Sequence, residues 1–370
     1  MQILFVLLAL GLAKSLSCNS YQCKTPSQNL QQNQCIYWDQ ATNGYFLQLC
    51  TEIEKPYCQL PDELTPSNET CSQIQPSAPL IYPGEKCTTS SDCAHSKQGC
   101  LQGVCRGTLE NQSCTSSWDC DIGLYCSPTN VCTKLISDGG KGCRSEFDCE
   151  NWLGCDIDEN SHSTEGTCRP YYSILPHETV KSCSSEGINT LCSSNMCGIP
   201  ELGENIVCTK PLSSSKKVPM PCDSDASCTS TTDDLFKTTF YSNCSCGYNP
   251  EGEAFCNLFP NDEPFEKFIK IMTKWYHSES VKQCHTMRRN AWNCITDWWN
   301  TNDATTLIYF QLKVERWPYI QKNDMCVSTI YEVEYNFWKQ AYEKMVDDND
   351  DDDNGILMYL AEGLGLFLYL

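Results

Sequence analysis

The 370-residue sequence has little histidine, little positive charge and no long uninterrupted apolar run. It contains five histidines, and the patterns GxSxG, HExxH, GxGxxG and the phosphate-binding P-loop are all absent. Lys and Arg total 26 against 47 Asp and Glu, which gives a formal net charge of −21. A chain this acidic does not favour nucleic acid as a partner. We therefore predict a protein that is not an enzyme, has no catalytic residues and binds no nucleic acid.

Aliphatic side chains are also scarce in the middle of the chain. From Cys87 to Cys168 there are 10 Val, Ile or Leu residues but 12 cysteines. So few apolar groups cannot stabilise small folded units by burial, and disulfides make up the deficit at roughly 2 to 4 kcal/mol each. Zinc is the alternative for clustered cysteines, but the CxxC spacing of zinc ribbons is absent.

What the chain does contain is a four-cysteine cassette written three times within residues 84–168. In each copy five residues separate the first two cysteines, and an Asp precedes the second: Asp92, Asp119 and Asp148. We expect this Asp to cap a turn by accepting backbone N–H bonds. Four cysteines allow three pairings, and the spacing does not choose among them. The cassette cysteines are Cys87, Cys93, Cys100, Cys105, Cys114, Cys120, Cys126, Cys132, Cys143, Cys149, Cys155 and Cys168.

The segments CTTSSDC from Cys87, CTSSWDCDIGLYC from Cys114 and CRSEFDCENWLGC from Cys143 resemble the N-terminal cysteine-rich pattern of Dickkopf proteins. They are also similar to the cassettes of repeat-bearing secreted proteins of protists. The resemblance covers about 85 of the 370 residues. It implies binding to an extracellular partner, but not Wnt antagonism, because the second, colipase-like domain of that family is not recognisable here.

The start of the chain is typical of a secretory signal. Residues 3–12 are apolar, and Ser15 and Ser17 occupy the −3 and −1 positions for cleavage before Cys18. All 30 cysteines follow that site, so complete pairing is possible and no free thiol is expected in an oxidising compartment. Residues 1–17 are therefore predicted to be a signal peptide, and the protein to be secreted or displayed on the extracellular surface.

Two further cysteine-rich stretches flank the cassettes. Residues 18–75 carry six irregularly spaced cysteines and a predicted hairpin across Thr42-Asn43-Gly44, and residues 76–83, with three prolines, are a linker. Residues 169–260 carry nine cysteines. We interpret them as two diverged units, the fourth with four cysteines and the fifth with five, so that one cysteine of the fifth unit is spare. Lys216-Lys217, in the linker between these two units, is a candidate cleavage site.

From residue 261 the pattern changes to a 3.6-residue apolar period. Asp262, Glu263 and Pro264 mark a helix start. Four amphipathic helices are predicted in residues 261–346, and we expect them to form an independent bundle. Six of the nine tryptophans fall here, and core packing is favoured over a carbohydrate or partner surface. The apolar stripes of the four helices begin at Phe265, Val281, Leu307 and Ile330.

Three cysteines lie within this helical region. Cys284 and Cys294 fall on the second predicted helix, where ten residues span about 15 Å. This is too far for a disulfide, so we predict that one of them pairs with Cys326 and the other with the spare cysteine of the fifth unit. The bundle would then be joined covalently to a rod of cysteine-rich units.

Sequons for N-glycosylation occur at Asn68, Asn111 and Asn243. Asn68, in a proline-rich polar loop, is the best predicted acceptor. Asn243 is the poorest, because the Cys244 that follows it is expected to be locked in a disulfide.

The chain ends in an acidic run, residues 347–355, and an apolar tail, residues 356–370, which is too short for an ordinary membrane span. Three interpretations stay open: a GPI-attachment signal, a helix packed on the bundle, and a calcium-binding loop. In the last, Asp350, Asp352 and Asn354 would be metal ligands, although Ala361 stands where the closing carboxylate belongs.

The sequence thus predicts small disulfide-rich repeat units with short hairpins, followed by an all-α helical bundle. The predicted function is a secreted or cell-surface binding or structural protein that presents its repeat units to an unknown extracellular protein or glycan. An extracellular protease inhibitor built from small disulfide modules is the alternative. No cofactor is expected apart from calcium at the C-terminal loop, and a membrane would be contacted only through a lipid anchor.

Overall fold

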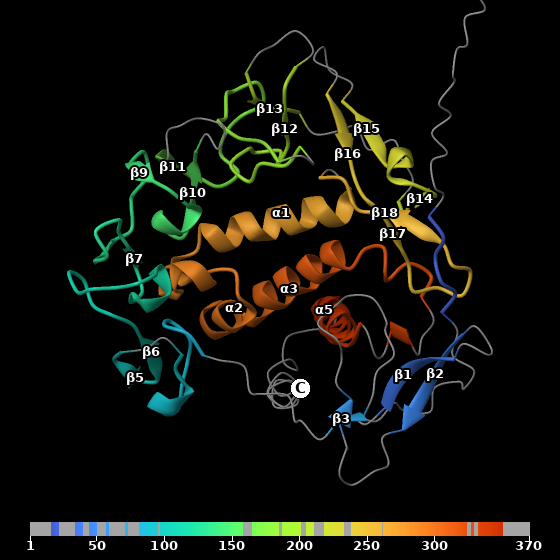
Figure 1. Ribbon diagram of the computed structural model, residues 1–370, viewed down its shortest axis with the longest axis horizontal. Coiled ribbons are helices and arrows are strands. Elements are labelled where there is room, and N and C mark those ends of the chain that lie inside the picture. The colour runs from blue at the N-terminus through green and yellow to red at the C-terminus, as the bar shows by residue number, and fades with distance from the viewer. Residues whose placement is uncertain are drawn as a thin grey trace, which may run out of the picture.

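Disulfide-rich units with short antiparallel hairpins come first in the chain and a helical region follows, as the sequence predicts. In Figure 1 the units curve around the helices, from β5 at the lower left past β12 at the top to β14 at the right. They do not extend from the helices as a rod. The computed structural model describes residues 16–21, 34–39, 44–49, 57–58, 71–72, 81–94, 97–157, 165–184, 187–200, 205–210, 218–232, 238–260, 262–323, 327–328 and 332–350.

Each of the three cassettes is built from one 3-10 turn and one hairpin. The first has η1 (Ser90–Asp92), β5 (Gly99–Leu101) and β6 (Val104–Arg106). The second has η2 (Ser117–Asp119), β7 (Leu124–Cys126) and β8 (Cys132–Lys134). The third has η3 (Glu146–Asp148), β10 (Leu153–Asp156) and β11 (Gly166–Pro170), with β9 (Lys141–Cys143) as an extra strand.

One disulfide pairing recurs in every unit: the first cysteine bonds the third, and the second bonds the last. The third and last cysteines lie opposite each other in the hairpin, as Cys126 and Cys132 do in the second cassette. Of the three pairings that the sequence allowed, the structure therefore uses one throughout, which confirms the repeat. The bonds are Cys87–Cys100 and Cys93–Cys105, Cys114–Cys126 and Cys120–Cys132, Cys143–Cys155 and Cys149–Cys168, Cys183–Cys197 and Cys192–Cys208, and Cys222–Cys244 and Cys228–Cys256.

The Asp before the second cysteine organises each 3-10 turn. In the first cassette, Oδ2 of Asp92 accepts the backbone N–H of Thr89 at 2.7 Å and that of Thr88 at 3.0 Å. These hydrogen bonds hold the pKa of the Asp92 carboxyl well below its usual range. Asp119 and Asp148 accept the equivalent pairs of N–H groups in the other cassettes. The predicted capping role is confirmed.

The fourth and fifth units and the N-terminal segment use equally short strands. Cys58 lies opposite Cys71 in the N-terminal segment, the same register that the third and last cysteines have in the five units. The hairpin predicted near Asn43 is confirmed, because Asp39 pairs with Gly44. The strands are β1 (Gln34–Asp39), β2 (Gly44–Leu49), β3 (Tyr57–Cys58), β4 (Cys71–Ser72), β12 (Cys197–Gly198), β13 (Val207–Cys208), β14 (Pro221–Cys222), β15 (Thr229–Thr231), β16 (Thr239–Tyr241), β17 (Cys244–Cys246) and β18 (Ala254–Cys256), and η4 spans Asp225–Ser227.

The helical region contains α1 (Glu263–Tyr276), α2 (Trp292–Trp298), α3 (Thr301–Glu315) and α5 (Val333–Asp350), with 3-10 turns η5 (Glu279–Gln283) and η6 (Thr286–Arg288) before α2. The start of α1 is as predicted, with Asp262 at the N-cap position and a Pro in the first turn. α3 begins earlier than its apolar stripe, because the Asn300 side chain accepts the Asp303 N–H at 3.0 Å and caps the helix. Figure 1 shows α1 beside α3, and α5 packs against α3.

The prediction of one helix from Val281 to Trp298 is wrong. The backbone is extended at Cys284, His285 and Ala291, so the segment is two 3-10 turns and one short helix. These breaks fold the chain back on itself. The Cα atoms of Cys284 and Cys294 therefore lie 5.8 Å apart, and the two residues form a disulfide that the helical spacing had appeared to forbid.

The spare cysteine of the fifth unit is also paired differently from the prediction. Cys246 bonds Cys18, 228 residues earlier, and thereby ties the N-terminal segment to the fifth unit. The predicted partner Cys326 lies outside the described residues. Every cysteine whose side chain the structure describes belongs to a disulfide, in agreement with the expectation of no free thiol.

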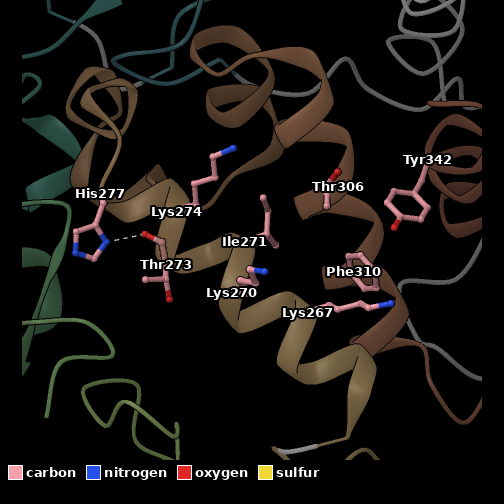
Figure 2. A pocket seen from close by; sticks show the side chains of 9 residues that line it. All are labelled: Lys267, Lys270, Ile271, Thr273, Lys274, His277, Thr306, Phe310 and Tyr342. Atoms are coloured by element: carbon pink, nitrogen blue, oxygen red, sulfur yellow. Dashed lines mark hydrogen bonds between the residues drawn. The ribbon is translucent and has the colours of Figure 1, made fainter. Parts of the chain in front are cut away.

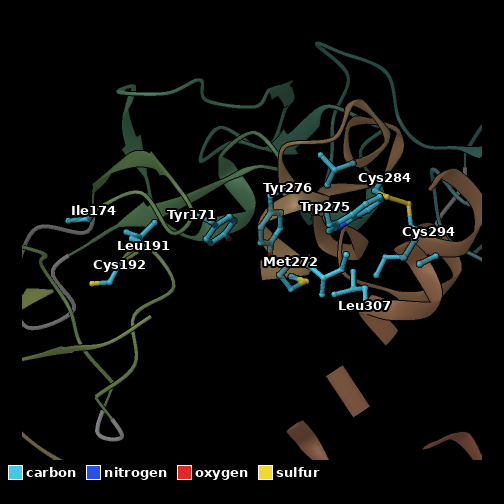
Figure 3. Packing of buried hydrophobic residues seen from close by; sticks show 14 of the residues in the cluster. Tyr171, Ile174, Leu191, Cys192, Met272, Trp275, Tyr276, Cys284, Cys294 and Leu307 are labelled. Carbon is cyan, nitrogen blue, oxygen red and sulfur yellow. A yellow bond between two sulfur atoms is a disulfide. The ribbon is translucent and has the colours of Figure 1, made fainter. Parts of the chain in front are cut away.

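The helices and the units share one hydrophobic core, so the expectation of an independent bundle does not hold. Figure 3 shows Tyr171 between Leu191, also from the unit side, and Tyr276 of α1, with Met272 and Trp275 beyond Tyr276. The rings of Tyr171 and Tyr276 stack with centroids 4.5 Å apart. The tryptophans of the helical region pack inside as favoured, with Trp275 fully buried and none exposed.

Candidate ligand-binding groove

A groove of about 670 Å³ runs along the face of α1 that the cysteine-rich units leave uncovered. Figure 2 shows side chains from α1, α3 and α5 around it. Its volume is within the range of small-molecule and cofactor sites. The groove is lined by Lys267, Lys270, Ile271, Thr273, Lys274, His277, Thr306, Phe310 and Tyr342, and none of these is acidic.

The basic residues of the groove come from one stripe of α1. Lys267, Lys270, Lys274 and His277 are spaced by three, four and three residues, so the helical period places them on one face. All four side chains are exposed, whereas Trp275 and its neighbours on the opposite face are buried in the shared core. α1 is therefore amphipathic in an unusual way for this chain: its solvent face is basic in a protein of net charge −21.

Two of the lysines have carboxylate partners at the edge of the groove. Lys267 Nζ lies 2.7 Å from Glu263 Oε1, and this hydrogen bond raises the pKa of Lys267. Lys274 Nζ lies 2.6 Å from Asp303 Oδ2. Lys270, between them, has no ion pair among the residues that the structure describes. Its ammonium group is thus the one most available to an incoming anion.

The floor of the groove is apolar and aromatic. Ile271 and Phe310 are buried, and Tyr342 of α5 stacks on Tyr309 with centroids 4.5 Å apart. The ammonium group of Lys267 lies 5.7 Å from the centre of the Phe310 ring, within reach of a cation–π contact. The floor is consequently held by the packing of α3 against α5.

Two threonines add hydroxyl oxygens to the walls. Thr273 Oγ1 donates to the Ile269 carbonyl and Thr306 Oγ1 donates to the Asn302 carbonyl, each at 2.8 Å. Since both hydroxyl protons are used, their remaining lone pairs can only accept hydrogen bonds. The described residues of the lining include no carboxylate and no thiol, and His277 Nδ1 contacts the Thr273 carbonyl at 2.7 Å. The chemistry that this arrangement offers is binding of an anion.

The cysteine-rich units fix the segment that follows α1. His285 is fully buried, and its Nε2–H donates to the carbonyls of Ser117 at 3.0 Å and Cys120 at 3.1 Å in the second cassette. Its Nδ1 accepts the Met287 N–H at 3.2 Å, so the imidazole is held in its neutral form. Burial is the main reason why the pKa of His285 falls to about 4.

The third cassette makes a second set of contacts with this segment. They involve Arg289, which follows η6 and is 1% exposed. Its Nη1 donates to the Glu146 carbonyl at 3.1 Å, and its Nη2 donates to the Tyr171 hydroxyl. From the same cassette, Asn151 Nδ2 donates to the carbonyls of Val281 and Cys284 at 2.7 and 2.8 Å. Polar groups exposed by the breaks around η5 and η6 are thus satisfied by the cassettes.

The residues predicted from sequence lie elsewhere. Cysteine sulfurs of several units come within 4.8 Å of one another, but they are bonded as disulfides and offer no thiolate to a metal. Asn111 and Asn243 are exposed, and Asn68 lies outside the described residues. Asp350 is the last residue of α5, but its side chain lies outside the described residues. So do Asp352, Asn354, residues 1–15 of the predicted signal, Lys216-Lys217 and the apolar tail. A search of the described residues finds no helix able to cross a membrane.

The groove itself was missed by sequence reasoning. One signal was present: three lysines at helical spacing beside the apolar stripe of α1, in a chain with few basic residues. Phe310 and Tyr342, however, come from two other helices, and their position beside α1 cannot be read from spacing.

Comparison with known proteins gives one distant relative. Protein psiQ of Dictyostelium discoideum is 24% identical over 244 residues, which make up 64% of this chain and 21% of psiQ. The chain therefore spans about a fifth of the length of that relative. No family model matches the chain, and no solved structure matches it. Together with the recurring disulfides, these findings identify a cysteine-rich repeat protein with the bond chemistry of an extracellular protein.

Proposed function

We propose that this is a non-enzymatic extracellular binding protein whose α1 groove takes an anionic ligand. The observation that carries the proposal is the groove lining: among the described residues it has three lysines and one histidine over an apolar floor, and no carboxylate. The chain has a net charge of −21, which by itself favours solubility, so solubility does not explain a positively charged groove. The cysteine-rich units act in this account as the frame that positions α1.

The secreted location, the glycosylation and the lipid anchor remain parts of the proposal. The disulfides support passage through an oxidising compartment. The Dickkopf resemblance supports an extracellular partner without naming it. The protease-inhibitor alternative stays a prediction, since no contact of the described loops favours it.

The test is binding of the purified full chain to two unrelated polyanions, dextran sulfate and polyglutamate, with neutral dextran as the reference. We expect both polyanions to bind, and we expect added salt to lower the affinity of each. Lys270→Glu should weaken binding by about fivefold or more, because an exposed ion pair contributes up to ~1 kcal/mol and the variant adds repulsion.

The matched control is Lys134→Glu, which changes the net charge equally on the exposed hairpin of the second cassette. It should leave polyanion binding within about twofold of the unsubstituted protein. Binding no tighter than that of neutral dextran, or an equal loss in the two variants, would reject the groove as the site.

A further inference from the structure

We infer that the ligand of the α1 groove is an acidic glycan, that is, a chain of sugar rings that carries carboxylate or sulfate groups as well as free hydroxyls. The inference rests on the proposed function, because it names the class of anion. It follows from three features of the groove taken together: the line of cations, the hydroxyl acceptors and the apolar floor.

The basic side chains form a line. Lys267, Lys270 and Lys274 span seven residues of helix, about 10 Å along the axis. Lys267 and Lys274 already pair with Glu263 and Asp303, whereas Lys270 has no ion pair in the described structure. Lysines at this spacing fit an extended chain with repeated negative charges, in which Lys270 binds the central one.

The walls accept hydrogen bonds. The hydroxyl groups of Thr273 and Thr306 donate their hydrogen bonds to backbone carbonyls, so each oxygen can only accept a hydrogen bond from the ligand. Sugar hydroxyls are such donors and stand next to the charged group on the same ring. A fatty acid carries a carboxylate and an alkyl chain but has no donor for these two oxygens.

The floor is apolar between the charges. Figure 2 shows Ile271 beside the lysines of α1, and Phe310 and Tyr342 on the side of the groove formed by the other two helices. A sugar ring presents apolar C–H groups on its face and polar groups at its edge, so one chain can meet floor, cations and hydroxyl oxygens at the same time. An acidic peptide such as polyglutamate reaches the lysines but has no comparable flat apolar face.

The test compares three probes on the full chain: a short oligogalacturonide, polyglutamate of equal charge, and laurate. Each is titrated against the unsubstituted protein, Thr306→Val and Thr133→Val. Valine keeps the shape of threonine and removes the acceptor oxygen. Thr133 is the matched control, an exposed threonine whose hydroxyl also donates to a backbone carbonyl, that of Val131 at 3.1 Å.

We expect the oligogalacturonide to bind most tightly. Thr306→Val should weaken its binding by about fivefold, since a hydrogen bond contributes about 1 kcal/mol, and should leave polyglutamate binding unchanged. Thr133→Val should change neither. Circular dichroism of each variant should match the unsubstituted protein, which shows that any loss is local.

The outcomes separate the two proposals. If polyglutamate or laurate binds as tightly as the oligogalacturonide, or if Thr306→Val weakens all anions equally, the glycan inference is overturned while the anion site stands. If none of the three probes binds, both the glycan inference and the anion-binding function fall.

Discussion

The second cassette and the α3–α5 pair are stabilised in opposite ways. The buried cluster of the cassette consists of Leu124 and four half-cystines, whereas the cluster between α3 and α5 contains Ile308, Leu312, Trp338 and three other large side chains and no cysteine. A unit with a covalent core needs few apolar side chains, because the disulfides restrict its unfolded chain. Its surface is then free to serve as an interface.

The cysteine-rich units form such an interface with the segment between α1 and α2, and we call this interface the joint. His285, Arg289 and Asn151 carry hydrogen bonds across it, and the Tyr171 ring packs on α1. The lesson is that the cassettes do more than stabilise themselves: they supply the polar partners and part of the core that the broken segment between α1 and α2 lacks. Substitutions at this joint should therefore cost more than substitutions inside either region.

The largest effect is expected for Arg289→Ala. This change leaves the Tyr171 hydroxyl and the Glu146 carbonyl without their buried donor and opens a cavity, so the free energy of unfolding should fall by roughly 3 to 5 kcal/mol. Urea unfolding followed by tryptophan fluorescence would measure it. Lys282→Ala, an exposed change six residues beyond α1, is the control and should cost less than about 0.5 kcal/mol. A loss below about 1 kcal/mol for Arg289→Ala would show that the joint is not a shared core.

The second effect is a pH dependence carried by His285, whose folded pKa of about 4 lies below the unfolded value of 6.5. The unfolded chain binds a proton first, so stability is full above about pH 6.5 and declines as the pH falls towards 4. The expected loss is roughly 3 kcal/mol, at about 1.4 kcal/mol per pKa unit.

Comparison with His285→Gln isolates this contribution, because every other ionisable group is common to both proteins. The difference in unfolding free energy between the two should shrink by that amount from about pH 7 to about pH 4. Parallel pH profiles would mean that the imidazole is not buried against the second cassette.

A smaller effect is expected inside a cassette. Asp119→Ala removes the acceptor for the N–H groups of Thr115 and Ser116 and should lower the free energy of unfolding by about 1 kcal/mol. The exposed Asp138 provides the comparison, and Asp138→Ala should be close to neutral. Equal shifts in melting temperature for the two variants would show that the cassette Asp contributes no more to stability than an ordinary exposed Asp.

The smallest effect is expected in the groove. Lys270→Glu alters an exposed side chain with no ion pair in the described structure, so the unfolding free energy should change by less than about 0.5 kcal/mol while polyanion binding weakens. A large loss of stability would indicate that Lys270 serves the fold, and the groove would then lose its strongest argument as a binding surface.

Local chemistry was predictable from the sequence, and long-range packing was not. The cassette spacing, the Asp caps and the start of α1 depend on residues a few positions apart, and all three are confirmed. The helix predicted from Val281 failed because two 3-10 turns and one short helix, α2, produce the same three-and-four spacing as one continuous helix. The Cys18–Cys246 bond joins positions that no local pattern relates.

The central claim, that the fourth unit and the helices share one core, is tested most directly by native-state hydrogen exchange. The amides of α1 from Ile271 to Tyr276 and those of the fourth unit around Cys192 and Cys197 should open with the same free energy. Arg289→Ala should lower both values by the same amount. Opening of α1 at a free energy more than about 1 kcal/mol away from that of the fourth unit would contradict the shared core and restore the independent bundle.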